Sequence, residues 1–328
     1  DKTPSPEIIW LEIFIFLGLF LCFYLFHKKL RHFWKHYFII AIGVSIFEMF
    51  TAPMWHSEHL GGWAYIYQDV SWILNTAWST MILTTIMFID LWLPKKTAGL
   101  RFLLYLLILT PLVLWGEMLM VWPQVRSYSS EVIASTTGWQ IAGVPVEVFY
   151  YAPVFMTLII GFYKYWSLYI EKIPLVPVKT PSLFTNLLIS VVIVFFFELL
   201  VEPMAQNINF PAWSYIYRDI TLIMTGIWIL AIWLSIFIVD KSVLHFNLVK
   251  KFGLYVLLSS LIMLPLESWF IKNGFRIYGS SVVANFSGFK TIITQLPVEI
   301  AFAVPMYLVL VIACIKYWII VFENKNRV

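Results

Sequence analysis

The sequence predicts an all-α, polytopic integral membrane protein with about nine transmembrane helices. Of its 328 residues, 61% are hydrophobic and only 12% are charged, and the mean hydropathy is +0.84. A soluble domain is about half apolar and a quarter charged. Apolar runs of about 20 residues, the length that crosses a bilayer, recur along the whole chain. In addition, a set of four such runs occurs twice in the chain.

The segments between the apolar runs are too short to form a soluble domain. We expect the spans to cover residues 8–26, 37–54, 70–93, 99–122, 145–163, 183–203, 220–239, 252–271 and 298–320.

The positive charges are distributed unevenly between the two sides that these spans define. Of the 22 Lys and Arg, those on the side of the N-terminus are Lys2, Arg126, Arg218, Lys272, Arg276 and Lys290, and all others fall on the opposite side. Basic connections favour the cytoplasmic side. The sequence therefore predicts a protein of the cytoplasmic (inner) membrane with its N-terminus outside and its C-terminus in the cytoplasm.

An internal repeat organises the chain. Residues 47–54 and 197–204 both contain Phe-Glu near the end of a span, and the loops 63–69 and 213–219 share the pattern Trp-x-Tyr-Ile-Tyr-x-Asp. A glutamate, then an arginine nine residues later, then a tyrosine follow in both halves, as do Pro-Val-Glu and Lys-Tyr-Trp. We expect residues 1–36 to form an N-terminal helix, 37–180 one four-helix repeat and 181–328 a second. Because each repeat has an even number of spans, the two should be parallel.

Four glutamates have no local structural reason to lie where they do. They are placed in the last turns of helices, where the helix dipole disfavours a carboxylate. Either the nearby Arg126 and Arg276 pair with them, or they serve in acid–base chemistry. These candidates for catalysis are Glu48, Glu117, Glu198 and Glu267.

Four other acids precede or open predicted helices. Asp69 and Asp219 stand just before apolar runs, where an aspartate can cap free backbone N–H groups. Glu147 and Glu299 follow a proline by two residues, a position that also favours a helix start. Both pairs are also candidates for function. The glutamates are candidates for catalysis, and the aspartates are candidates for substrate binding.

The two aromatic loops allow two interpretations. Their rings suit an aromatic belt at the membrane interface, or they line a substrate pocket and stabilise a carbocation. The residues concerned are Trp63, Tyr65, Tyr67, Trp213, Tyr215 and Tyr217.

The sequence predicts no metal or other cofactor and no nucleic-acid partner. The segment 56–59 reads His-Ser-Glu-His, but its counterpart 206–209 reads Gln-Asn-Ile-Asn, which does not favour a metal site. Cys22 and Cys314 both lie within apolar runs, so neither indicates a disulfide.

Parts of each repeat resemble the lycopene cyclase domain of heterodimeric or fused carotenoid cyclases. The residues that carry the resemblance are Leu-Pro-Leu-Glu-Ser-Trp at 264–269, Arg-Ile-Tyr at 276–278 and Leu-Pro-Val-Glu-Ile-Ala-Phe at 296–302, with counterparts at 115–117, 126–128 and 144–149. The resemblance covers about 130 residues. The family's motif has two consecutive glutamates, of which the second is Val148 or Ile300 here.

The resemblance implies a membrane-embedded isoprenoid cyclase. Glu198, Glu267 and Glu299 would then donate and remove protons, with Trp213, Tyr215 and Tyr217 around the cation. The alternatives are a non-catalytic subunit of a larger membrane complex, a pigment- or lipid-binding protein, and a proton-coupled transporter. The expected partners are membrane lipid, a hydrophobic isoprenoid or carotenoid, and other membrane subunits.

Overall fold

The computed structural model describes residues 2–4, 6–173, 183–243 and 247–324, and in them the chain is an all-α membrane protein. Eight of the described helices are long and apolar enough to cross a membrane. A ninth helix, α6, has 23 residues, several of them tyrosines. The long helices are α1 (Pro6–Phe26), α2 (Phe33–Thr51), α3 (Trp72–Trp92), α4 (Ala98–Val121), α6 (Val148–Ile170), α7 (Leu183–Val201), α8 (Leu222–Ser242), α9 (Leu248–Lys272) and α11 (Val298–Glu323).

The short elements between these helices occur in the same order in both halves, except that the described part of the second half has no strands equivalent to the last two of the first half. The first half contains β1 (Trp55–Ser57), β2 (Tyr65–Tyr67), β3 (Val70–Ser71), β4 (Arg126–Tyr128), α5 (Ser130–Ser135), β5 (Gln140–Ile141) and β6 (Val144–Pro145). The second half contains β7 (Ala205–Asn207), β8 (Tyr215–Tyr217), β9 (Ile220–Thr221), β10 (Arg276–Tyr278) and α10 (Ser280–Ala284). The predicted boundary between the repeats, at 180 and 181, lies outside the described residues.

Two antiparallel strand pairs position the polar residues that follow α4 and α9. Strand β1 pairs with β4 so that Ser57 faces Arg126, and β7 pairs with β10 so that Asn207 faces Arg276. Each pair joins the loop after one helix to the loop after another, so it holds an arginine against the end of the helix that carries a glutamate.

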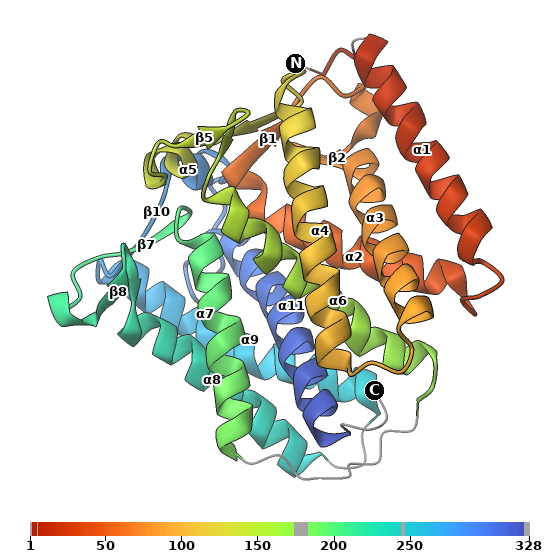
Figure 1. Ribbon diagram of the computed structural model, residues 1–328. Helices are drawn as coiled ribbons and strands as arrows, with labels where there is room; N and C mark the ends of the chain where they lie inside the picture. Colours follow the sequence, from red (N-terminus) through yellow and green to blue (C-terminus); the bar gives the residue numbers. More distant parts are fainter. Residues whose placement is uncertain (1, 5, 174–182, 244–246, 325–328) are drawn as a thin grey trace.

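Helices α6 and α11 form the centre of the bundle. Each packs against the other, and α11 also contacts α2, α7 and α9. Figure 1 shows α11 in the interior and α1 at one edge, where α1 packs mainly on α3. A Cβ atom added at Gly161 of α6 would lie 2.5 Å from Sγ and 3.0 Å from Cα of Cys314 in α11. A glycine is therefore what allows the two backbones to approach so closely.

Helix α6 continues seven residues beyond its predicted end at 163. The prediction ended there because Lys164 follows, and a charge is costly within a membrane. In the structure the Lys164 ammonium lies 2.6 Å from an Asp90 carboxylate oxygen. This ion pair offsets the lysine charge, so the helix can extend to Ile170.

The prediction that Asp69 and Asp219 cap the following helices is wrong. The N-cap of α3 is Ser71, whose hydroxyl accepts hydrogen bonds from the N–H groups of Ile73 and Leu74. The N-cap of α8 is Thr221. The β2–β3 and β8–β9 hairpins separate each aspartate from its helix by two residues.

Replacing Gly161 with alanine should destabilise the protein by about 1–3 kcal/mol, the usual cost of adding atoms to a well-packed contact. The added methyl group meets the Cys314 backbone, which cannot move without shifting α11. The matched control is Gly253→Ala in α9, where nothing lies within 4 Å of the new Cβ. That change should be neutral or stabilising because alanine favours a helix. Thermal unfolding in detergent measures both, and equal midpoints for the two variants would contradict the close approach.

Candidate functional site

A glutamate, an arginine and a tyrosine form a polar cluster in the first half. The Glu117 carboxylate at the end of α4 accepts a hydrogen bond of 3.0 Å from the Tyr128 hydroxyl. Its oxygen also lies 3.4 Å from Nε of Arg126. A second nitrogen of Arg126 donates to the Ser57 hydroxyl at 3.1 Å, and its guanidinium lies 5.8 Å from the Trp55 ring centroid. The strands β1 and β4 carry Ser57, Arg126 and Tyr128, and helix α4 carries Glu117.

The same cluster recurs in the second half with shorter distances. Glu267 of α9 accepts a hydrogen bond of 2.5 Å from the Tyr278 hydroxyl and lies 3.1 Å from Nε of Arg276. Burial and the Glu267 charge raise the pKa of Tyr278 well above its ordinary value. Burial opposes the charge of Arg276, but the neighbouring Glu267 and Glu198 carboxylates outweigh it and raise the arginine pKa. The tyrosine therefore stays a hydrogen-bond donor and the arginine stays a cation.

Glu48 and Glu198 add a second carboxylate to each cluster. Both are buried, on α2 and α7 respectively. Each lies close enough to its cluster to interact electrostatically with the arginine and with the other glutamate. The arginine forms its ion pair with Glu117 or Glu267, and neither Glu48 nor Glu198 forms one with another described residue. Each cluster thus contains one carboxyl group in an ion pair and one without an ion pair among the described residues.

The two clusters differ sharply in the space beside them. The first borders a cavity of about 50 Å³, and the second a cavity of about 510 Å³. The larger volume falls within the range of small-molecule sites, roughly 300–1,000 Å³. First-half residues, among them Met49 and Phe50, line it together with many second-half residues, so the large cavity lies where the two halves meet.

Two substitutions between the halves account for the difference in volume. Trp55 and Tyr151 line the small cavity. Their counterparts in the repeat are Ala205 and Ala303, and both line the large one. Two bulky aromatic side chains therefore fill the first site, whereas methyl groups leave the second site open.

The remaining predicted glutamates bind the backbone of the preceding loop. Glu147 accepts a hydrogen bond of 2.6 Å from the Thr137 N–H, and Glu299 accepts one of 2.7 Å from the Ser287 N–H. Glu299 also lines the large cavity, whereas Glu147 is not among the described residues that line the small one. Each glutamate thus fixes a loop to the start of α6 or α11.

The aromatic loop residues lie mostly away from the cavity. Tyr67 lines it, but Trp63 and Trp213 are 55% and 72% exposed. Trp213, Tyr215 and Tyr217 are not among its described lining residues. The Tyr65 hydroxyl donates to the Ser57 carbonyl at 2.9 Å, and Tyr215 does the same to Asn207 at 3.3 Å. These two tyrosines hold the hairpins against β1 and β7.

The two aspartates of these loops have different surroundings. The Asp69 carboxylate lies 2.8 Å from Nδ1 of His56. The Asp219 carbonyl accepts a hydrogen bond of 2.8 Å from the Asn207 side chain. Neither aspartate lines the large cavity among the described residues. In the described part of the chain no group of three or more His, Cys, Asp and Glu is arranged to hold a metal ion.

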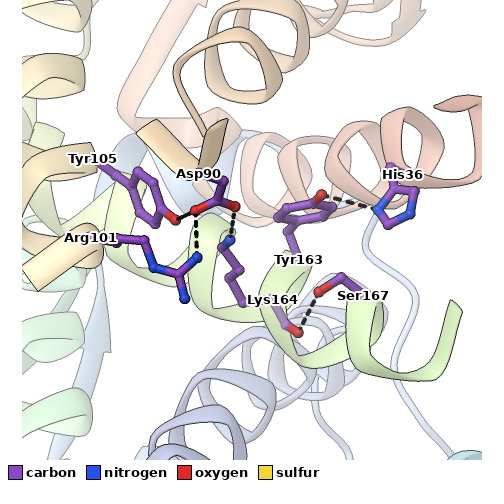
Figure 2. A network of polar contacts seen from close by, with 7 residues as sticks. All are labelled: His36, Asp90, Arg101, Tyr105, Tyr163, Lys164 and Ser167. Carbon is purple, nitrogen blue, oxygen red and sulfur yellow. Dashed lines mark hydrogen bonds and ion pairs between the residues drawn. The ribbon is translucent and has the colours of Figure 1, made fainter. Parts of the chain in front are cut away.

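Sequence reasoning missed a second polar network, at the opposite end of the helices (Figure 2). Asp90 of α3 contacts Lys164 at 2.6 Å and Arg101 at 3.1 Å and accepts a hydrogen bond from the Tyr105 hydroxyl. Asp240 repeats the arrangement with Lys316 at 2.7 Å and with Tyr255. The signal was available, because Asp90 and Asp240 occupy matched positions of the repeat, as do Lys164 and Lys316.

A third contact that sequence reasoning missed joins the two halves in the loops. Glu131 of α5 accepts hydrogen bonds from the Ser280 and Ser281 hydroxyls and, at 2.6 Å, from the Ser281 N–H. Burial opposes its charge, but these hydrogen bonds outweigh it and lower the Glu131 pKa to about 2. The carboxylate therefore remains ionised at neutral pH and links α5 to α10.

Comparisons of the chain with protein-family models, with curated proteins and with solved structures give no significant match.

Proposed function

We propose that the chain is a membrane protein that binds an isoprenoid-like lipid in the cavity of about 510 Å³ and acts on it by carboxylate acid–base chemistry. The observation that supports this proposal most strongly is the contrast between the repeats. Only one of two equivalent glutamate–arginine–tyrosine clusters in the described chain borders a large apolar cavity. A purely structural cluster needs no such cavity. The proposal places the protein in the cytoplasmic membrane, N-terminus outside.

The chemistry follows from the pairing of the carboxyl groups. Arg276 already neutralises Glu267 at 3.1 Å. Glu198 lines the same cavity without an ion pair among the described residues, so it is the carboxyl group left to hold a proton for an alkene. Phe197, Trp228 and Tyr307 also line the cavity, and their π faces can stabilise a carbocation. Glu267 or Glu299 would then accept the proton that the cation releases.

Binding without chemistry is the second candidate function. The resemblance to lycopene cyclases supports an enzyme, but the second glutamate of that motif is Val148 or Ile300 here. A lipid- or pigment-binding membrane subunit would use the same cavity and would not need Glu198 to exchange protons. The two candidates differ in what a Glu→Gln change does, since glutamine keeps the shape of the side chain and removes its acidity.

The test is expression of the chain in a host that accumulates linear carotenoids and linear isoprenoid alcohols, with chromatographic analysis of the products. Glu198→Gln and Glu267→Gln should each lower product formation roughly hundredfold or more, the usual effect of removing a general acid or base. The matched control, Glu117→Gln, changes the equivalent cluster beside the small cavity and should retain activity. Equal product levels from all variants would overturn the acid–base proposal.

A binding measurement keeps the proposal falsifiable when a variant folds poorly. Ala303→Tyr introduces the residue that fills the first-half site, and it leaves every carboxyl group in place. Lipids that co-purify with the detergent-solubilised protein should therefore be lost from Ala303→Tyr and retained by Glu267→Gln. Mass spectrometry of the extracts, together with the absorption spectrum, reports both. Retention of the same lipids by Ala303→Tyr would show that they bind elsewhere.

A further inference from the structure

Five buried polar atoms of residues that line the large cavity have no hydrogen-bond partner among the described residues. Two of them, Nε of Arg276 and Oε2 of Glu299, have counterparts in the first half that lack a partner too. The three without such a counterpart are Oε2 of Glu267, the hydroxyl of Tyr307 and the indole N–H of Trp228. Their side chains are 2%, 6% and 5% exposed. An unpaired buried polar group destabilises the folded protein, because it has given up its hydrogen bonds to water without gaining others. The three atoms therefore indicate a polar partner that the cavity receives.

These three side chains come from different helices and line the same cavity. Trp228 of α8 and Tyr307 of α11 lie with their ring centroids 5.0 Å apart at an angle of 82°. The Tyr307 hydroxyl is close enough to Glu198 and Arg276 to interact electrostatically with both, and Arg276 contacts Glu267. A single polar group of a ligand at this place can therefore meet an indole, a phenol and a carboxylate.

The first repeat lacks this arrangement. The counterpart of Tyr307 is Phe155, which has no hydroxyl, and it lies 6.3 Å from Trp78, the counterpart of Trp228. Neither Trp78 nor Glu117 has an unpaired buried atom, although Glu48 does. The Tyr307 hydroxyl is thus present in the half that has the large cavity and absent from the half that does not.

The donors and acceptors restrict the chemistry of the ligand. An indole N–H can only donate, and an ionised carboxylate can only accept. A hydrocarbon would satisfy neither. A phosphate would bring negative charge to a cavity wall that already has three glutamates. Among the described lining residues the only Lys, Arg or His is Arg276, and it is already paired with Glu267. An ammonium group can only donate and would leave Trp228 unpaired.

We infer that the ligand of this cavity is an isoprenoid alcohol, whose hydroxyl accepts from Trp228 and donates to Glu267 or Tyr307. A hydroxyl is a small neutral group that both donates and accepts. This inference rests on the proposed function, since it specifies the class of lipid that the cavity binds. It places the hydroxyl end beside Trp228, Tyr307 and Glu267 and the hydrocarbon chain along the apolar remainder of the cavity.

The test compares the affinities of four probes with one carbon skeleton for the detergent-solubilised protein: farnesol, farnesene, farnesylamine and farnesyl phosphate. Equilibrium binding of radiolabelled probe is measured, and binding to Ala303→Tyr, whose cavity is filled, is subtracted as micelle background. Farnesol should bind roughly tenfold more tightly than farnesene, the gain expected from one or two neutral hydrogen bonds. Farnesylamine and farnesyl phosphate should bind more weakly than farnesol.

A conservative variant separates recognition of the hydroxyl from a structural role. Tyr307→Phe reproduces the Phe155 of the first repeat and keeps the ring. It should remove most of the farnesol preference and leave the farnesene affinity unchanged. Equal affinities of farnesol and farnesene in the unmodified protein, tighter binding of the amine or phosphate, or an equal loss for both probes in Tyr307→Phe would each overturn the inference. If no probe binds above the Ala303→Tyr background, the proposed function fails with it.

Discussion

Replacing Asp90 with alanine should lower the free energy of unfolding by about 3 kcal/mol, the low end of the cost of breaking a buried ion pair. The Asp90 carboxylate contacts the Lys164 ammonium at 2.6 Å and the Arg101 guanidinium at 3.1 Å. Its removal leaves two cations, 14% and 18% exposed, without their common counterion. The midpoint of thermal unfolding in detergent should fall accordingly.

Two controls test that reasoning. Asp240→Ala removes the equivalent carboxylate, but Asp240 is 40% exposed and, among the described residues, forms an ion pair with one cation, Lys316, at 2.7 Å. Its loss should therefore cost much less. Adding Lys164→Met to Asp90→Ala removes one of the two cations that lose their counterion and leaves Arg101, so the double variant should recover part of the lost stability. Equal losses for Asp90→Ala and Asp240→Ala, or no recovery in the double variant, would contradict a buried ion pair at the first site.

The membrane fold was predictable because apolar length and composition determine it almost alone. The spans 8–26 and 183–203 match α1 and α7 to within two residues at each end. The end of α6 was not predictable from hydropathy, since Lys164 is tolerated only because Asp90, 74 residues earlier, lies beside it. The helix caps Ser71 and Thr221 were missed because each follows a short β-hairpin that separates the aspartate, Asp69 or Asp219, from the helix. The paired strands have only two or three residues, too few to be recognised from the sequence.

The candidate site was predictable in part. A carboxylate at the unfavourable end of a helix dipole can be recognised in the sequence, and this argument selected Glu117 and Glu267 with the nearby Arg126 and Arg276. The structure places Arg126 in contact with Glu117 and Arg276 in contact with Glu267. The cavity was not predictable, since its volume depends on Ala205 and Ala303, two small residues with no chemical signal of their own. Tyr307 was missed for a related reason. In the sequence, a tyrosine of an aromatic-rich helix cannot be told from a residue that only packs in the core, and only the structure shows that its hydroxyl has no hydrogen-bond partner.

Comparison of the repeats provides the remaining signal. At most matched positions the two halves keep the same chemistry, including the glutamate, arginine and tyrosine of each cluster. Where they differ beside the cluster, the first half has Trp55, Tyr151 and Phe155, and the second has alanine, alanine and tyrosine. The two alanines give a larger cavity, and the tyrosine adds a hydroxyl group to its wall. The first cluster is therefore an internal reference for what the fold alone requires.

Replacing Tyr151 with alanine should destabilise the protein by about 3–5 kcal/mol, as for other large aromatic residues truncated in a core. Tyr151 is 4% exposed and fills the first-half site, where about 50 Å³ remains free. Tyr151→Phe is the control, because it keeps the ring and should change stability far less. The measurement is again the midpoint of thermal unfolding in detergent, and a small loss for Tyr151→Ala would show that the first site collapses around the vacancy.

The reciprocal change, Ala303→Tyr, should not destabilise the protein. Because the second cavity is already open, a tyrosine there fills space without displacing packed atoms, so stability should be unchanged or increased while lipid binding is lost. A destabilising Ala303→Tyr would mean that the walls of the second cavity cannot accept the side chain that the first repeat packs. If Tyr151→Ala destabilises the protein and Ala303→Tyr does not, the aromatic residues of the first repeat stabilise the bundle. The alanines of the second repeat then leave a binding site open and contribute less to stability.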